Sequence, residues 1–156
     1  MDAPGARNRA HQRSEPSSSP LGSVIVLDGK MIGGERNQTQ ELPDATAHAG
    51  MMAIRRACED TGEMELRGAT LYSTLQPCGM CTMAAIWSKV RRVVYGAGRQ
   101  DVHAMYFEAK HIDTLDFITD AYRDDIEIVG GCLRNECAAL YSPPDADLSE
   151  EQQANL

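Results

Sequence analysis

Long apolar runs are missing from this sequence. No stretch approaches the ~18 apolar residues that a membrane-spanning helix needs, and the first residues lack the apolar core of a signal peptide. Arg7, Arg9 and Arg13 with several serines resemble an organelle transit peptide only faintly, and nearby acidic residues argue against one. We therefore predict a cytoplasmic protein with no membrane partner.

Basic residues are scarce. The chain has 15 Lys and Arg against 23 Asp and Glu, a formal net charge of -8. Binding to nucleic-acid phosphates draws on clustered Lys and Arg. The composition therefore favours a small-molecule ligand over tRNA or DNA, although acidity alone leaves room for a local basic patch.

Large apolar residues are nearly absent from residues 1–20, which hold three prolines and a run of serines. Such a segment buries too little surface to offset its ordering entropy, so we predict a disordered tail. Residues 142–156 (SPPDADLSEEQQANL) are acidic and predict a second flexible tail. Between them, residues 21–141 are long enough for one domain with its own core.

Strand and helix patterns alternate through residues 21–141. SVIVLDGKMIGG predicts two strands joined at Asp28-Gly29. Apolar spacing predicts a helix over 46–60, with Asp44 or Thr46 as its N-cap, and another over 79–89. Further strands are expected at 69–74, 92–97 and 126–131, and further helices at 113–122 and 131–141. This alternation indicates an α/β domain whose sheet is at least partly parallel.

Two of the five cysteines form a C-x-x-C pair, Cys78 and Cys81, thirty residues after His48. At this spacing both sulfurs lie on one side of a helical turn, and a helix N-terminus favours thiolates. Three protein ligands leave the fourth position of a zinc ion to water, which is typical of catalytic zinc. A redox dithiol is the competing interpretation.

The other three cysteines could join a different site. Of these, Cys132 and Cys137 are expected to be ordinary packed thiols, and Cys58 is left open.

Two segments together, TAHAGMMAIR and LYSTLQPCGMCTMAAIWSKVRRVVYGA, resemble the cytidine deaminase-like zinc deaminases. The signature of that superfamily is H-x-E followed at a distance by P-C-x-x-C. The resemblance covers about residues 21–100. Within the superfamily, the sequence most resembles the guanine deaminase and free-base deaminase branch. It implies a three-layer α/β/α sandwich with a mixed five-stranded sheet, usually a homodimer. It also implies that His48, Cys78 and Cys81 bind Zn²⁺.

The resemblance further implies substrate contacts by Asn37, by the backbone near Thr46 and Ala47, by Trp87 and by Tyr106. From the sequence alone, an asparagine such as Asn37 is more often a turn residue. For Tyr106, a partly buried loop is preferred over a substrate contact.

The sequence departs from the superfamily pattern at two places. Gly50 stands where the signature has the glutamate that moves protons between water, base and ammonia. In addition, ARNRAHQRSEPSSS, where relatives carry an amphipathic helix, predicts at best a weak one. One outer layer is therefore expected to be thin, or to be covered by a partner subunit.

The expected function is zinc-dependent hydrolytic deamination of a free nucleobase or nucleoside of the guanine or cytosine type, as in nucleobase salvage, impaired by Gly50. One alternative is a zinc-binding pseudoenzyme or partner subunit that binds a base without turnover. Another is a relative of the tRNA adenosine deaminases. A substitute carboxylate from Glu35, Glu41 or Glu108 is a further possibility.

Overall fold

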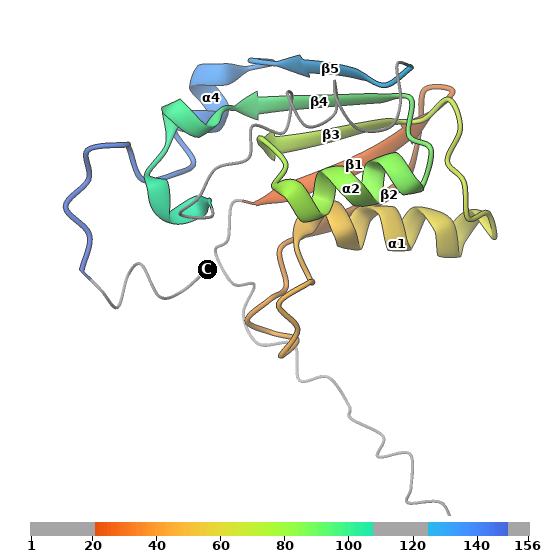
Figure 1. Ribbon diagram of the computed structural model, residues 1–156, viewed down its shortest axis with the longest axis horizontal. Coiled ribbons are helices and arrows are strands. Elements are labelled where there is room, and N and C mark those ends of the chain that lie inside the picture. The colour runs from red at the N-terminus through yellow and green to blue at the C-terminus, as the bar shows by residue number, and fades with distance from the viewer. Residues whose placement is uncertain (1–20, 108–124, 150–156) are drawn as a thin grey trace, which may run out of the picture.

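The computed structural model describes residues 21–107 and 125–149, which form a five-stranded sheet in the order β2-β1-β3-β4-β5 (Figure 1). β1 is antiparallel to both β2 and β3, whereas β3, β4 and β5 are parallel. The predicted mixed sheet is therefore confirmed. The strands are β1 (Gly22–Leu27), β2 (Lys30–Arg36), β3 (Thr70–Leu75), β4 (Arg92–Ala97) and β5 (Glu127–Gly130).

The predicted hairpin at Asp28-Gly29 is also confirmed. Leu27 pairs with Lys30 across a two-residue turn. Asp28 has a φ of 49° and Gly29 a φ of 74°. A turn with two positive φ values matches the twist of the strands that it joins, and Asp-Gly adopts it readily. This turn fixes the pairing next to it, and the register shifts between Ile25 and Val26.

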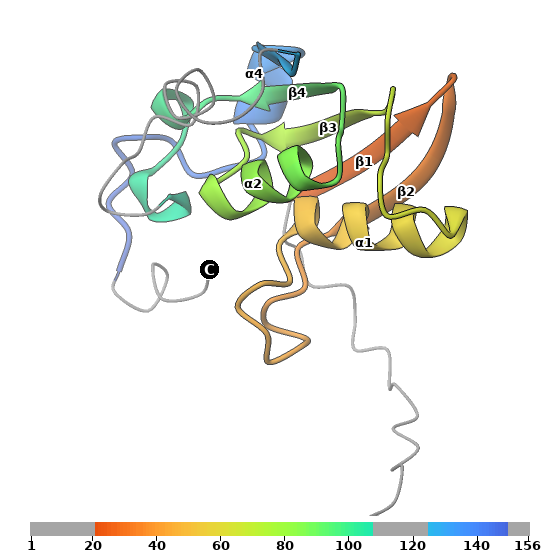
Figure 2. The same ribbon diagram turned by 45° about the vertical axis from the view of Figure 1, so that its right-hand side comes forward.

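Two helices lie side by side on one face of the sheet, α1 (Ala49–Thr61) and α2 (Gly79–Trp87) (Figures 1 and 2). The predicted start of α1 at Thr46 is wrong by three residues. The Asp44 carboxylate accepts hydrogen bonds from the Thr46 amide and hydroxyl, at 2.8 and 2.7 Å. These two residues therefore form a local turn, and His48 is the N-cap.

A single apolar cluster fills the space between these helices and the sheet. Helix α1 lies close to β2 at Gly33, where an added Cβ would lie 2.6 Å from the Ala53 carbonyl oxygen and 2.8 Å from the Ala57 Cβ. A glycine is required there for the helix to lie at that distance. The buried members are Ile25, Ala53, Ile54, Ala57, Leu66, Ala69, Leu71, Ala85, Val90 and Val93.

The opposite face of the sheet is covered, within the described residues, by the short helix α4 (Arg134–Ala138) alone. Cys137 of α4 lies directly over Gly96 of β4. The three-layer class is confirmed with a thin third layer, and α4 is shorter than the predicted 131–141. The helix predicted at 113–122 and the tail at 1–20 lie outside the described residues. No helix among those described is long and apolar enough to cross a membrane.

Candidate metal centre

A pocket opens where the chain leaves the carboxyl end of β3 and where α1 and α2 begin. In open α/β sheets, ligands bind beyond the carboxyl ends of the parallel strands, so this is the expected place for a site. The pocket encloses about 80 Å³, enough for several water molecules. It is lined by Leu21, Gly22, Ser23, Asn37, His48, Ala49, Gly50, Ser73, Leu75, Gln76, Pro77, Cys78, Cys81 and Tyr106.

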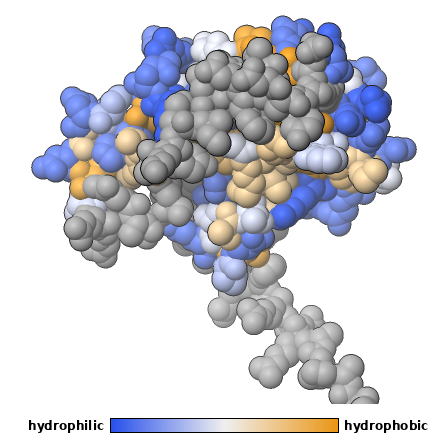
Figure 3. All heavy atoms as spheres, viewed as in Figure 1, coloured by the Kyte–Doolittle hydropathy of each residue, from blue (hydrophilic) through white to orange (hydrophobic). Residues whose placement is uncertain are grey.

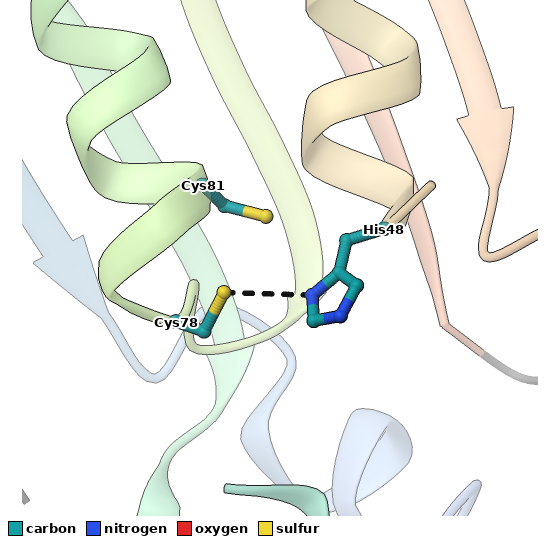
Figure 4. A group of neighbouring side chains, drawn as sticks. All are labelled: His48, Cys78 and Cys81. Carbon is teal, nitrogen blue, oxygen red and sulfur yellow. Dashed lines mark hydrogen bonds between the residues drawn. The ribbon is translucent and has the colours of Figure 1, made fainter. Parts of the chain in front are cut away.

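Three predicted metal ligands converge in this pocket (Figure 4). His48 projects from the start of α1, and Cys78 and Cys81 project from the first turn of α2 toward it. The ligand atoms of the three residues lie within 4.8 Å of one another. In the part of the chain that the structure describes, no other group of His, Cys, Asp or Glu side chains converges in this way.

The separation of His48 and Cys78 fits a tetrahedral zinc ion. With Zn–S near 2.3 Å and Zn–N near 2.0 Å, tetrahedral angles place a nitrogen and a sulfur about 3.5 Å apart. The His48 Nδ1 and the Cys78 Sγ are 3.5 Å apart. A borderline-soft ion matches one imidazole and two sulfurs. The three residues are therefore positioned to hold zinc, with one coordination position left for a non-protein ligand.

The two sulfurs differ in their surroundings. A hydrogen bond from Cys81 lowers the pKa of Cys78, and the neighbouring His48 lowers it further. The same bond and burial raise the pKa of Cys81, which is 5% exposed. Zinc takes cysteine as thiolate, so zinc binding is coupled to the loss of thiol protons from this pair.

The start of α1 supports the second sulfur. The backbone N–H groups of Gly50 and Met51 hydrogen-bond the Cys81 sulfur and favour its thiolate form. Gly50 therefore lies against a metal ligand, as the sequence pattern implied. A Cβ added at Gly50 would lie 3.1 Å from both the Cβ and the Sγ of Cys81, and 3.9 Å from the Ser23 hydroxyl.

The predicted substrate contacts are divided between the pocket and other parts of the molecule. Asn37 and Tyr106 line the pocket. The Asn37 amide nitrogen donates to the Thr39 hydroxyl at 3.1 Å, while its buried Oδ1 has no hydrogen-bond partner in the described structure. That amide therefore has hydrogen-bonding capacity left for a ligand.

Thr46, Ala47 and Trp87 do not line the pocket. Thr46 is exposed and bonded to Asp44, and Ala47 is buried in the loop that precedes α1. Trp87 ends α2 and is 72% exposed. The pocket-lining backbone at the start of α1 belongs instead to Ala49 and Gly50.

Tyr106 is held at the pocket by a residue that the sequence did not single out. The Tyr141 ring meets the Tyr106 ring edge to face, with centroids 5.2 Å apart. The Tyr141 hydroxyl is 2.6 Å from the Thr74 hydroxyl on β3. The Tyr106 hydroxyl accepts the Ser142 N–H at 3.3 Å. The end of the domain is thereby tied to the site.

The residues on the floor of the pocket were not predicted from the sequence either. Ser23 of β1 donates a hydrogen bond to Ser73 of β3 at 3.1 Å, and Gln76 follows the end of β3. The signal was present, because each serine interrupts an apolar strand at a position that faces the helices. A serine on the core face of a strand indicates a polar cavity above it.

The remaining cysteines lie outside the site. The prediction of a packed thiol is wrong for Cys132, which is exposed, while Cys137 packs against Gly96. Cys58 is half-buried, and burial raises its pKa.

Comparisons with known proteins agree with this geometry. Residues 5–97 match the cytidine and deoxycytidylate deaminase zinc-binding region. The tRNA-specific adenosine deaminase of Bacillus subtilis is 33% identical over 153 residues, covering 96% of this chain and 89% of that protein. The enzyme of the same description from Agrobacterium fabrum is 48% identical over 88 residues, which span 56% of this chain and 58% of the relative.

Solved structures of deaminases also match this chain. A structure from a study of A-to-I editing by tRNA deaminases at the wobble position is 37% identical, with a TM-score of 0.66, covering 78% of this chain and 84% of that one. A guanine deaminase of Bacillus subtilis is 29% identical with a TM-score of 0.53, covering 83% and 71%. Identity is thus higher to these tRNA deaminases than to this member of the guanine deaminase branch, which the sequence pattern had favoured.

Proposed function

This chain belongs to the cytidine and deoxycytidylate deaminase zinc-binding family, and we propose that it is a cytoplasmic tRNA adenosine deaminase whose turnover is impaired at Gly50. The observation that carries the choice of substrate is the alignment with a tRNA-specific adenosine deaminase along 96% of the chain. It favours the tRNA alternative over the free nucleobase that the sequence first suggested.

The residues of the pocket supply binding and metal ligation in this proposal. Zinc, when held by His48, Cys78 and Cys81, supplies a Lewis acid that activates water at neutral pH. Asn37 offers its unpartnered amide oxygen to the edge of a base. The Tyr106 ring offers an apolar surface against which a base can pack.

The described lining of the pocket has no carboxylate. Within residues 21–107 and 125–149, none of the residues that line it is Asp or Glu. Glu35 pairs with Arg56 at 3.6 Å and Glu41 pairs with Arg36, and neither carboxylate lines the pocket. Glu108 lies outside the described residues. We therefore infer that neither described glutamate substitutes for the missing carboxylate, and that activity is low.

A second candidate is a zinc-loaded subunit that binds a base without turnover, and the arginines favour it. Tracking a phosphate backbone requires arginines that are available to phosphates. Within residues 21–107 and 125–149, each of the following arginines instead has a carboxylate within 4.0 Å: Arg36, Arg55, Arg56, Arg67, Arg92 and Arg134.

Restoring the carboxylate tests the proposal. Gly50→Glu should raise inosine formation in an anticodon stem-loop by a factor of ~100 to 10,000, the usual contribution of general acid/base catalysis. Gly50→Gln is the matched control, because it has the same size but cannot carry the proton. The Cβ of either residue would lie 3.1 Å from the Cβ and Sγ of Cys81, so both variants place the same demand on that side chain.

The same variants should be assayed on guanine, cytosine and cytidine. A gain on a free base but not on RNA would show that the substrate is a free base. No gain on any substrate, with a free base still bound in calorimetry, would show that the chain is a non-catalytic subunit.

A further inference from the structure

We propose that the start of α4 is a redox modification site, at which Cys132 and Cys137 form a reversible disulfide on exposure to hydrogen peroxide. The two cysteines lie outside the metal centre, so the inference does not depend on the proposed function. Their sequence, CLRNEC, places them five positions apart. The structure shows how this spacing brings the two thiols together.

Both cysteine side chains line the same hollow. It has a volume of about 390 Å³ and lies beside α4, where Val94 and Tyr95 of β4 form part of its wall. Cys132 is exposed, whereas Cys137 is half-buried. The Cys132 side chain can therefore turn toward the Cys137 thiol through open space.

The backbone between β5 and α4 brings the two residues close to each other. Gly131 and Leu133, on either side of Cys132, have φ values of 84° and 53°. The left-handed conformation is uncommon for a residue such as leucine, and here it reverses the direction of the chain. As a result, the Cys137 thiol donates a hydrogen bond to the Cys132 carbonyl oxygen at 3.9 Å. A thiol in contact with the backbone of Cys132 is close enough for the Cys132 side chain to reach by rotation.

Hydrogen bonds hold both backbones in place. The Cys132 N–H donates to the Tyr95 carbonyl at 3.1 Å, and the Cys137 N–H donates to the Leu133 carbonyl at 2.9 Å. The Cys137 sulfur also lies directly over Gly96 of β4. Two thiols held in this way have a high effective concentration relative to each other. This arrangement favours a disulfide within one chain over a disulfide between two copies.

The surroundings of the two thiols assign the order of the reaction. The exposed Cys132 thiolate attacks one peroxide oxygen, the O–O bond breaks, water leaves and Cys132 becomes a sulfenic acid. Burial raises the pKa of Cys137, and the neighbouring Cys132 raises it further, so Cys137 reacts second. Its sulfur displaces the hydroxyl group of the sulfenic acid as a second water. Two thiols are thus oxidised to one disulfide, and one peroxide is reduced to two waters.

The site is connected to the pocket through α4. Cys137 packs against the apolar cluster that contains Tyr141, and the Tyr141 ring contacts Tyr106 in the pocket. A covalent bond at the start of α4 would therefore restrain the element that holds Tyr106. Disulfides of cytosolic proteins are usually transient and redox-sensing, which agrees with a reversible bond at this place.

The test uses the full zinc-loaded chain, because bound zinc slows the oxidation of Cys78 and Cys81. The chain is treated with hydrogen peroxide, its remaining thiols are alkylated, and it is unfolded and digested with trypsin. Trypsin cleaves after Arg134, which lies between the two cysteines, so the disulfide joins two separate peptides. We expect this joined pair, with a mass two hydrogens below the sum of the reduced peptides, and its loss on treatment with dithiothreitol.

Isotope labelling shows whether the bond lies within one chain. Chains labelled with ¹⁵N are mixed with unlabelled chains before oxidation. A bond within one chain gives joined peptides of a single isotope, and a bond between copies gives mixed pairs.

Single variants test the role of each thiol. Cys137→Ser should lose the joined pair and leave Cys132 as a sulfenic acid that reacts with dimedone. Cys132→Ser should lose the pair and leave Cys137 reduced. Cys58→Ser is the matched control, at a half-buried thiol that does not line the hollow, and should form the pair in full.

Three results would overturn the proposal. They are joined peptides of mixed isotopes, oxidation of Cys132 beyond the sulfenic acid without a joined pair, and two thiols that stay reduced in excess peroxide. None of these results bears on the deaminase assignment, which is tested at Gly50.

Discussion

At the scale of single residues, the site separates metal binding from proton transfer. His48, Cys78 and Cys81 converge with the spacing of a tetrahedral ion. Their positions depend on the starts of two helices and not on the side chain at Gly50, since that residue contributes only its backbone N–H to Cys81. A glycine at this position is therefore compatible with three converging metal ligands.

Replacing one sulfur tests the metal centre directly. Cys81→Ser should reduce bound zinc from about one ion per chain to a small fraction, because a serine hydroxyl is a poor zinc ligand. Zinc content after dialysis is the measurement. Cys132→Ser is the control, since Cys132 is exposed and outside the site. Equal zinc in both variants would contradict the ligand assignment.

At the scale of secondary-structure elements, the link between Tyr141 and β3 has a pH dependence. Burial raises the pKa of Tyr141 to about 12, whereas a tyrosine in an unfolded chain titrates near 10. The unfolded chain therefore loses this proton first as the pH rises. The free energy of unfolding is expected to be unaffected by this group below pH ~10 and to fall by about 2–3 kcal/mol as the pH rises to ~12.

Urea unfolding from pH 9 to 12 measures this effect. In Tyr141→Phe, the free energy of unfolding should fall less as the pH rises. Loss of the bond to Thr74 should lower that free energy by the same amount at every pH. Tyr72→Phe, at an exposed tyrosine of β3, should retain the fall. Parallel pH profiles for the original chain and Tyr141→Phe would contradict the argument.

Much of the secondary structure could be predicted from the sequence. The short apolar run VIVL and the Asp28-Gly29 turn act over a few residues, so the hairpin could be predicted from the sequence alone. The start of α1 could not be predicted in this way, because Asp44 and Thr46 can either cap a helix or close a turn. Only the packing of the 37–47 loop selects the turn. The link from Tyr141 to Tyr106 joins residues 35 positions apart, and no local pattern signals it.

At the scale of the whole molecule, the outer face of α2 is expected to be the contact surface of the homodimer implied by the resemblance. The helix contains no charged residue, and its outward positions include Met80, Met83 and Trp87, of which Trp87 is the most exposed. Figure 3 shows more hydrophobic residues near the centre of this face and hydrophilic ones around its edge. Large exposed apolar side chains of this kind are typical of protein interfaces.

A charge placed on that face should separate the copies. Trp87→Glu is expected to convert a dimer to a monomer, because it would bury an unpaired carboxylate in the interface. Sedimentation velocity measures the mass. Met64→Glu is the control, at a side chain that is 81% exposed and lies in the loop after α1. An original chain that is already monomeric would contradict the expectation.

Trp87 is also the only tryptophan of the chain. Its indole stands at the last turn of the short helix whose first turn carries both cysteine ligands. Its emission spectrum therefore originates from one known position. Shifts in that fluorescence would follow metal uptake at one end of α2 and self-association at the other, without any added label.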